Sequence, residues 1–183
     1  SLRAAVKDKK ADLGFSFDGD GDRLIAVAED GQVLNGDQLL YIYSQLFLAG
    51  GRLKNNLVVS TVMSNIGFIN ALRAIGVKHK ATEVGDRSVF FEMKKSGAVL
   101  GGEEAGHIIF SDFNAVGDGI LSALMLARAM KHFNKPLSKL AAQDKMSSHA
   151  APELFSLIWA NQAGSDARRL CTDTLLHLAG HNK

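Results

Sequence analysis

The feature that most constrains the fold of this chain is a regular alternation of short apolar runs with longer amphipathic segments. The apolar runs are rich in β-branched residues, and glycine follows most of the amphipathic segments, as it does at helix ends. The expected strands are 57–62, 77–82, 98–100 and 107–110, and the expected helices are 37–49, 66–75, 86–95 and 118–133, with a last short helix opening at Pro136. Because strands that alternate with helices usually pair in parallel, we predict an α/β fold with helices packed on a mixed, largely parallel sheet.

The N-terminal part of the chain has a different pattern. Apolar residues alternate with small or polar ones over 13–17, and a second apolar run covers 24–28. A turn over 29–32 then leads into a third short apolar run at 33–34. We expect strands joined by tight connections here, and we expect residues 2–12 to enter the first strand almost directly.

The composition is that of an ordinary globular protein, with 46% hydrophobic and 22% charged residues and a net charge of +2. The basic residues are scattered, which argues against a surface for nucleic acid or for a membrane. No apolar run is long enough to cross a membrane, and the N-terminal residues lack the pattern of a signal peptide. The single cysteine, Cys171, cannot form an internal disulfide, so we expect a cytoplasmic protein. The sequence begins at Ser1 rather than methionine, so we expect a piece of a longer protein, and no pattern indicates its oligomeric state.

Between the first two expected strands lies a stretch in which carboxylates alternate with glycines. Asp18, Asp20 and Asp22 are separated by Gly19 and Gly21. Three like charges so close together repel one another, so a group of opposite charge should lie among them. The glycines let the backbone turn tightly enough for the carboxylates to converge, and carboxylate oxygens are the ligands that magnesium prefers. We therefore predict a Mg²⁺ site formed by the three aspartates.

Two other interpretations of this stretch compete with the magnesium site. An EF-hand calcium loop fits the spacing of the three aspartates and Glu29, but Arg23 occupies the position that must be glycine. The flanks are also strand-like rather than helical. A solvated acidic turn is the second alternative, and both the glycine alternation and the flanking apolar strands argue against it.

Four further motifs follow along the chain. They are Thr61-Val62-Met63-Ser64-Asn65, Val84-Gly85-Asp86-Arg87, Gly102-Glu103-Glu104-Ala105-Gly106-His107 and Gly117-Asp118-Gly119. Together with the acidic stretch, they resemble in sequence and order the motifs of the phosphohexomutases, and most of all those of bacterial phosphoglucosamine mutases. These enzymes move a phosphoryl group between the 1 and 6 positions of a hexose. The resemblance implies that 1–32 is the end of a metal-loop domain and 33–143 a sugar-loop domain, whereas 144–183 is a divergent tail without assignment.

The resemblance implies roles for individual residues. Arg23 would donate a forked pair of hydrogen bonds to the transferring phosphoryl group, unless it forms an ion pair with Asp20 or Asp22 instead. Glu103 would accept hydrogen bonds from two neighbouring sugar hydroxyls, the alternative being an exposed turn residue. Ala105 stands where the family usually has a serine, so one hydrogen bond to the sugar is expected to be missing.

Four more residues are expected at the substrate site. Asp86 and Arg87 begin an expected helix, whose amides favour an anion, although a capping aspartate beside a surface arginine fits equally well. Ser64, together with Asn65, is expected to cap the next helix and to border the cleft. His107 fits a hydrogen-bonded structural residue as well as a substrate-binding one. The loops after three parallel strands would then face a common cleft.

The resemblance also implies a catalytic phosphoserine, which passes its phosphoryl group to the sugar phosphate through a bisphosphate intermediate. No residue before Asp18 matches the loop that carries this serine, and Ser148 lies on the wrong side of the sugar-binding motif. We therefore expect a fragment of a magnesium-dependent phosphoglucosamine mutase, with glucosamine phosphate as its hexose phosphate partner, that is inactive alone. The alternatives are a phosphomannomutase or phosphoglucomutase, or a non-catalytic remnant that binds metal and sugar phosphate.

Overall fold

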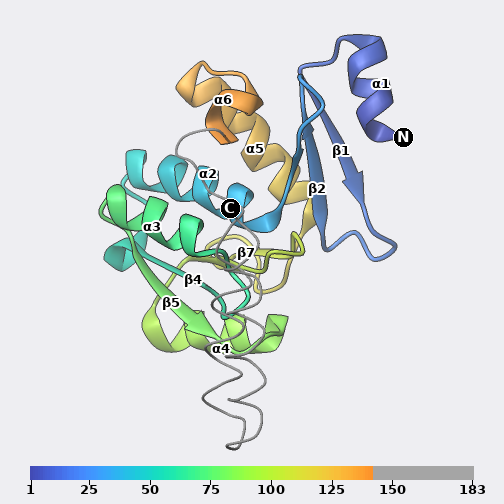
Figure 1. Ribbon diagram of the computed structural model, residues 1–183. Helices are drawn as coiled ribbons and strands as arrows, with labels where there is room; N and C mark the ends of the chain where they lie inside the picture. The colour runs from blue at the N-terminus through green and yellow to red at the C-terminus, as the bar shows by residue number, and fades with distance from the viewer. Residues whose placement is uncertain (142–183) are drawn as a thin grey trace, which may run out of the picture. The chain divides into compact units, whose positions relative to one another are not determined.

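The computed structural model of the chain describes residues 1–141 (Figure 1). The expectations for 144–183, including those on Ser148 and Cys171, lie outside the described residues. The described residues form a four-stranded sheet, a separate three-stranded sheet and the helices that pack on them. No helix in this part of the chain has the length and apolar character needed to cross a membrane.

The four-stranded sheet carries the parallel pairing that the sequence predicted. Its strands are β4 (Leu57–Thr61), β5 (Lys78–Thr82), β6 (Leu100–Gly102) and β7 (Ile108–Phe110), in the order β5-β4-β6-β7. β4 pairs in parallel with both β5 and β6, whereas β7 is antiparallel to β6. The predicted mixed, largely parallel sheet is therefore confirmed.

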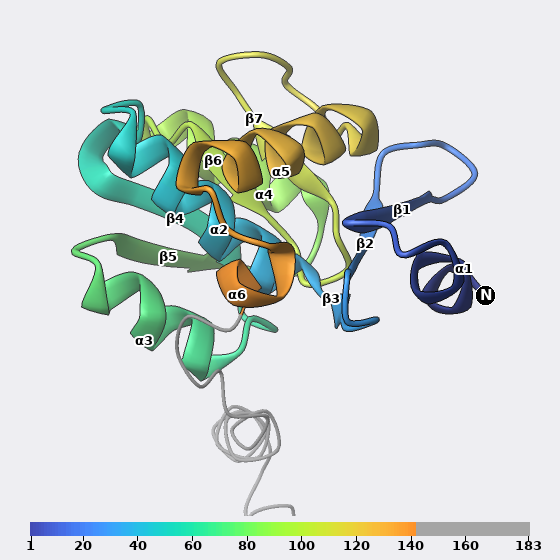
Figure 2. The same ribbon diagram turned by 90° about the horizontal axis from the view of Figure 1, so that it is seen from above.

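Helices cover both faces of this sheet. The helices of this part of the chain are α2 (Gly36–Ala49), α3 (Ile66–Ala74), α4 (Asp86–Ser96), α5 (Gly119–Phe133) and α6 (Leu137–Ala141). α5 and α6 pack on α2, and α5 also packs on the three-stranded sheet. α2 and α3 lie on one side of the sheet and α4 lies on the other (Figure 1), and α2 contacts both α3 and α5, as the second view also shows (Figure 2). The predicted helices match these in position because their apolar periodicity and glycine terminators are unambiguous.

The central helix of the fold is α2. Leu39, Leu40 and Ile42 are each fully buried, so this helix is apolar nearly all round, as expected of a helix enclosed by others. Tyr43 is also fully buried, and its hydroxyl donates a 2.8 Å hydrogen bond to the Ser122 carbonyl, which satisfies its polar atom in the core. The position of α2 therefore fixes the elements on either side of it.

The N-terminal strands form a three-stranded antiparallel sheet. They are β1 (Leu13–Phe17), β2 (Leu24–Ala28) and β3 (Val33–Leu34), in chain order. Phe17 and Leu24 form the last pair of the β1–β2 hairpin, so residues 18–23 are its connecting loop. We call these residues the acidic loop.

The N-terminal segment differs from the expectation that residues 2–12 would enter the first strand almost directly. Leu2–Lys9 forms a helix, α1, whose first turn is capped by the Ser1 hydroxyl and whose end is a left-handed Lys10. Half of the residues of this helix are charged and it buries Val6 alone, so its apolar periodicity was too weak to predict. Val6 packs closely on β1, where a Cβ added at Gly14 would lie 2.5 Å from a Val6 methyl group.

The strand expected at 98–100 is also displaced, because β6 covers Leu100–Gly102. Glycines usually end a strand in a sequence-based prediction, but here they belong to one. A Cβ at Gly101 would lie 2.6 Å from the Met93 sulfur and 2.9 Å from the Val59 carbonyl oxygen. The close packing of α4 on β6 thus requires glycine at this position.

Candidate functional site

Three loops meet at one edge of the four-stranded sheet, where its parallel strands end. β4 leads to residues 62–65, β5 to 83–85 and β6 to 103–107. The chain winds from β4 to β5 and then crosses to β6 on the far side of β4, so the direction of winding reverses between β4 and β6. Open α/β sheets bind ligands outside the carboxyl ends of their strands at such a point. We call residues 102–107 the sugar loop.

Glu103 connects two of these loops. One of its carboxylate oxygens accepts a 3.0 Å hydrogen bond from the amide of Gly85, which lies between β5 and α4. Glu103 is half-buried, and no hydrogen bond to its other carboxylate oxygen is found within residues 1–141. The side chain is thus held at one oxygen and can still accept hydrogen bonds at the other, which fits the predicted contact with sugar hydroxyls.

Asp86 and Arg87 begin α4 beside this contact, and both are exposed. Gly85 precedes them with φ of 127°, a conformation that a side chain would strain. The Asp86 carboxylate accepts a hydrogen bond from the Arg87 amide at 2.7 Å, but the N-cap of α4 is Gly85 and no side chain caps the helix, so Asp86 is not the capping residue. The helix N-terminus leaves Arg87 exposed near Glu103, so an anion-binding role for the pair remains a prediction.

Ser64 differs from the other predicted site residues because its side chain is buried. Its hydroxyl donates a 2.8 Å hydrogen bond to the Asp37 carboxylate, and Ser64 retains only 3% of its surface exposure. The cap of α3 is Asn65, whose side chain accepts the Gly67 amide at 2.7 Å. Ser64 therefore holds the loop in place, whereas the exposed residues there are Val62 and Met63.

Ala105 is exposed at the tip of the sugar loop, close to the N-terminal sheet. The following residue, Gly106, has φ of 91°, and its carbonyl accepts the Leu24 amide at 3.1 Å. A cavity of about 270 Å³ lies beside Ala105 and is also lined by Ile25 and Val33. The sugar loop is thus attached to the strand that follows the acidic loop.

The acidic loop is held partly by its own carboxylate. Asp18 accepts hydrogen bonds from the amides of Gly21 (3.1 Å) and Arg23 (3.4 Å), and the Arg23 guanidinium lies 3.6 Å from its other oxygen. Partial desolvation by itself raises the pKa of the Asp18 carboxyl. The two backbone hydrogen bonds, a hydrogen bond with the Asp22 carboxyl and the charge of the Arg23 guanidinium act in the opposite direction, and together they lower this pKa. The ion pair considered for Arg23 thus forms with Asp18, rather than with Asp20 or Asp22 as the alternative had it.

His107 joins the sugar loop to the acidic loop. Its backbone pairs with that of Arg23, and its Nε2 lies 3.7 Å from an Asp22 oxygen. The ring is buried against Gly117, where an added Cβ would lie 2.3 Å from Nε2. Its Nδ1 is buried without a hydrogen-bond partner in the described part of the chain. A buried ring in this place fits the structural interpretation of His107 and keeps the two loops adjacent.

The carboxylates of the acidic loop are suitable ligands for a hard cation, but their side chains do not converge on a common point. Asp18 and Asp20 are exposed and Asp22 is half-buried. Within residues 1–141 no group of three or more acidic, histidine or cysteine side chains is arranged to hold a metal ion. The three aspartates lie on one tight loop and are largely solvated, and a magnesium site formed by them stays a prediction.

The first turn of α2 is the part of the site that sequence reasoning missed. Gly36 donates its amide to the Glu104 carbonyl at 2.7 Å, and Asn35 donates to the Glu104 carboxylate at 3.4 Å. Asp37 is fully buried and accepts from the β4–α3 loop. Asn35 and Gln38 form a capping box, which is readable from sequence, but its contacts with loops far along the chain are not.

Comparison with known protein families gives a match to the model described as phosphoglucomutase/phosphomannomutase, alpha/beta/alpha domain III, over residues 35–146. A phosphoglucosamine mutase of Anoxybacillus flavithermus is 58% identical over 145 residues, and one of Bacillus subtilis is 57% identical over 143 residues. These alignments cover 79% and 78% of this chain but only 32% of each relative. The chain therefore spans about a third of the length of the curated relatives it matches.

Solved structures give the same result at the level of the fold. A phosphoglucomutase/phosphomannomutase family protein of Burkholderia thailandensis superposes with a TM-score of 0.69 at 27% identity, covering 77% of this chain and 31% of that protein. A protein described as a putative phosphomannomutase of Thermus thermophilus superposes with a TM-score of 0.71 at 22% identity, covering 78% and 32%. The arrangement of sheet and helices is thus shared with these structures.

Proposed function

The chain belongs to the phosphoglucomutase/phosphomannomutase family, and on that premise we propose that it is the acidic-loop and sugar-loop part of a phosphoglucosamine mutase. The proposed reaction interconverts glucosamine 6-phosphate and glucosamine 1-phosphate. The relatives that support this choice are phosphoglucosamine mutases at 53–58% identity. We propose that 1–32 ends one domain and 33–143 forms the next, which the start of the family match at residue 35 supports.

The observation that carries this proposal is the position of Glu103. Its carboxylate lies at the reversal point of the sheet, is held by the Gly85 amide and has an oxygen left for a ligand. A carboxylate oxygen can accept hydrogen bonds from neighbouring hydroxyls, which a hexose offers in pairs. Arg87 lies in the first turn of α4 and Arg23 on the acidic loop, and both are exposed, as cations that bind a phosphate must be.

We assign the remaining chemistry of the site to the acidic loop and to His107. Arg23 would donate hydrogen bonds to the oxygens of the phosphoryl group, leaving its exposed ion pair with Asp18. His107 keeps Asp22 beside the sugar loop, so that phosphate and sugar meet at one place. A magnesium ion bound by the three aspartates would neutralise charge on the phosphoryl group.

The phosphoserine step is proposed to depend on a part of the longer protein that this sequence does not include. The sequence before Asp18 contains no match to the serine loop, so we infer that the chain alone does not turn over glucosamine 6-phosphate. Turnover that disappears in Ser148→Ala would contradict this inference.

Two alternatives are tested by the same experiment. The family model is named for phosphoglucomutase and phosphomannomutase, which favours comparison of glucose and mannose phosphates with the amino sugar. The exposed Ala105 offers no hydroxyl to the sugar, which is consistent with a remnant that binds its ligand weakly. Calorimetric titration of the chain with the 6-phosphates of glucosamine, glucose and mannose separates these possibilities.

The decisive variant in that titration is Glu103→Ala. Removal of a carboxylate that accepts two sugar hydroxyls is expected to weaken binding by about 1 to 3 kcal/mol, because those hydroxyls lose their partner. Asp8→Ala is the control, since Asp8 is an exposed carboxylate of α1 outside the loops of the site. Equal binding by the wild type and Glu103→Ala would remove the sugar loop from the site.

A further inference from the structure

A continuous chain of buried polar groups runs from the first turn of α2 to the outer strand β5. It begins at Asp37, whose side chain has no exposed surface. One Asp37 oxygen accepts the Ser64 hydroxyl at 2.8 Å, and the other accepts the Asn65 amide at 2.7 Å. Both partners belong to the β4–α3 loop, so one carboxylate fixes this loop at two successive residues.

The chain continues from Ser64 into the sheet. The Ser64 hydroxyl oxygen lies 2.8 Å from that of Ser60 on β4, and the Ser60 oxygen lies 2.6 Å from Nε2 of His79 on β5. Ser60 is fully buried and His79 is partly so. Four side chains on different elements are therefore joined by short contacts, and none of these contacts is required by secondary structure.

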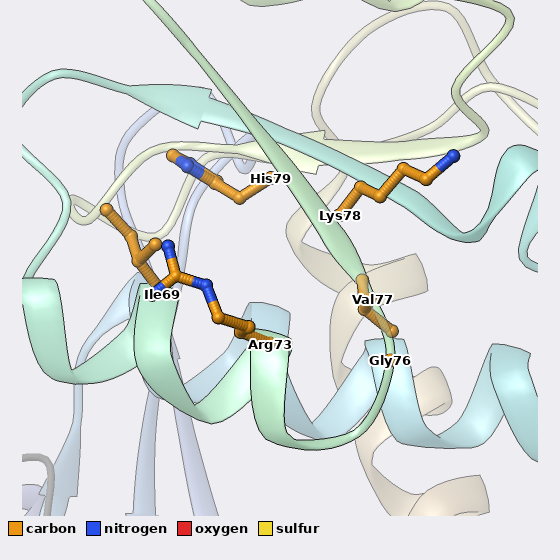
Figure 3. A pocket seen from close by; sticks show the side chains of 6 residues that line it. All are labelled: Ile69, Arg73, Gly76, Val77, Lys78 and His79. Atoms are coloured by element: carbon orange, nitrogen blue, oxygen red, sulfur yellow. The ribbon is translucent and has the colours of Figure 1, made fainter.

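The far end of this hydrogen-bond chain is His79, which lines a pocket of about 500 Å³ between α3 and β5 (Figure 3). The His79 ring lies on the same side of β5 as the Arg73 guanidinium, whereas Lys78 extends away from both (Figure 3). Burial lowers the pKa of His79, so the ring is neutral at physiological pH and carries a single proton on one of its two nitrogens.

Proton counting gives the chain a direction. Each serine hydroxyl has one proton, and an ionised carboxylate can only accept. Ser64 must therefore donate to Asp37, which leaves its oxygen to accept the proton of Ser60. The Ser60 oxygen must in turn accept from His79, so the ring proton has to be on Nε2. With the opposite tautomer, Nε2 would be an acceptor, and the two hydroxyl protons would have to serve three contacts, so that one contact would have no proton.

A buried carboxylate is costly, and this one also has a like charge nearby. Burial raises the pKa of Asp37 to about 6, and the negative charge of Glu104 acts in the same direction. An apolar residue at this position would avoid the cost but would leave the Asn65 amide and the Ser64 hydroxyl without their acceptor. The arrangement is thus suited to holding the loop in one position rather than to adding stability.

We propose that Asp37 is a positioning residue of the candidate site: it fixes the β4–α3 loop through a one-way hydrogen-bond chain that also sets the tautomer of His79. The role in positioning a substrate rests on the proposed function, whereas the existence of the hydrogen-bond chain from Asp37 to His79 does not. His79, on the outer strand, is then coupled to the loop at the reversal point of the sheet.

The test is nuclear magnetic resonance of the full chain, at a pH above the value of about 6 for Asp37. Long-range proton–nitrogen spectra of the histidine rings report the tautomer of His79, and amide spectra report the β4–α3 loop. We expect the proton on Nε2 in the wild type. We expect Ser64→Ala to change the tautomer balance of His79, although Ser64 does not touch that ring, and to shift the Met63 and Asn65 amides.

Two further variants distinguish coupling between Ser64 and the His79 tautomer from a general disturbance of the fold. Ser64→Thr keeps the hydroxyl and is expected to restore the wild-type tautomer. Ser44→Ala removes a buried hydroxyl of α2 that bonds only within its own helix, to the Leu40 carbonyl, and is expected to leave His79 unchanged. A proton on Nδ1 in the wild type, or a His79 ring indifferent to Ser64→Ala, would overturn the proposal.

Binding of glucosamine 6-phosphate is measured separately on the same variants. Weaker binding by Ser64→Ala, with recovery in Ser64→Thr, is the result expected if the loop contacts the ligand. If the wild type binds no sugar phosphate, the proposed function fails. The spectra of the His79 ring still decide whether the hydrogen-bond chain exists. If the wild type binds and Ser64→Ala binds equally well, the positioning role is wrong.

Discussion

At the scale of single residues, the site is built from carboxylates in different environments. Asp18 is exposed and hydrogen-bonded, so its pKa is lowered, whereas the fully buried Asp37 has a raised pKa. Glu103 lies between these extremes, half-buried and held at one oxygen. The sequence predicted Glu103 and the acidic loop from motifs, but it did not predict Asp37, because burial of a carboxylate depends on elements that meet only in the fold.

The raised pKa of Asp37 gives a prediction for stability. Its pKa is about 6 in the folded chain against 3.8 in the unfolded one, so the folded state binds the proton more tightly. The stabilisation from protonation of Asp37 is complete below pH 3.8 and is lost as the pH rises through about 6. A difference of about two pKa units corresponds to about 3 kcal/mol.

Urea unfolding of the wild type and of Asp37→Asn across this pH range tests that prediction. The free energy of unfolding of the wild type should fall relative to that of the variant as pH rises. Asp8→Asn, at an exposed aspartate of α1, is the control and should follow the wild type. Parallel curves for the wild type and Asp37→Asn would show that Asp37 is not titrating with a raised pKa.

At the scale of elements, the helices of the α/β part were predictable because each has a clear apolar face and a terminator. The errors have local causes. α1 has one buried residue and therefore little periodicity, and β6 contains glycines that close packing of α4 demands. The convergence of the loops followed from the parallel pairing, whereas the hydrogen bonds between them depend on side-chain geometry that no periodicity encodes.

The contact between α2 and the sugar loop gives a prediction at this scale. A Cβ at Gly36 would lie 1.9 Å from the Glu103 carbonyl oxygen, so Gly36→Ala must displace the loop or the helix. We expect a loss of about 1 to 3 kcal/mol in the free energy of unfolding, measured with urea. Gly50→Ala, after the other end of α2, places its Cβ no closer than 3.4 Å to any neighbour and is expected to change stability little.

The acidic loop gives a prediction about magnesium. If the aspartates bind the ion, then Mg²⁺ at about one hundred times its Kd should raise the free energy of unfolding by about 2.7 kcal/mol. The increase should appear as a higher Tm and should be lost in Asp20→Asn. Asp12→Asn, at an aspartate before β1 and outside the loop, is the control. An unchanged response in Asp20→Asn would place the ion elsewhere.

At the scale of the whole molecule, two separate sheets contribute to the candidate site. The acidic loop belongs to the three-stranded sheet, and the sugar loop follows β6 of the four-stranded sheet. The Arg23–His107 pairing and the contact of His107 with Asp22 connect them. The order of motifs along the chain predicted both loops, but the histidine that joins them could not be distinguished from a core residue in the sequence.

The central claim is that the three loops at the carboxyl ends of β4, β5 and β6 form one binding site for a sugar phosphate. The most direct measurement is amide chemical-shift mapping of the full chain during titration with glucosamine 6-phosphate. We predict saturable shifts that begin together in 62–65, 83–87 and 102–107, and that are lost in Glu103→Ala but kept in Asp8→Ala. Shifts confined to residues outside these three loops, such as those lining the α3–β5 pocket, would contradict the claim.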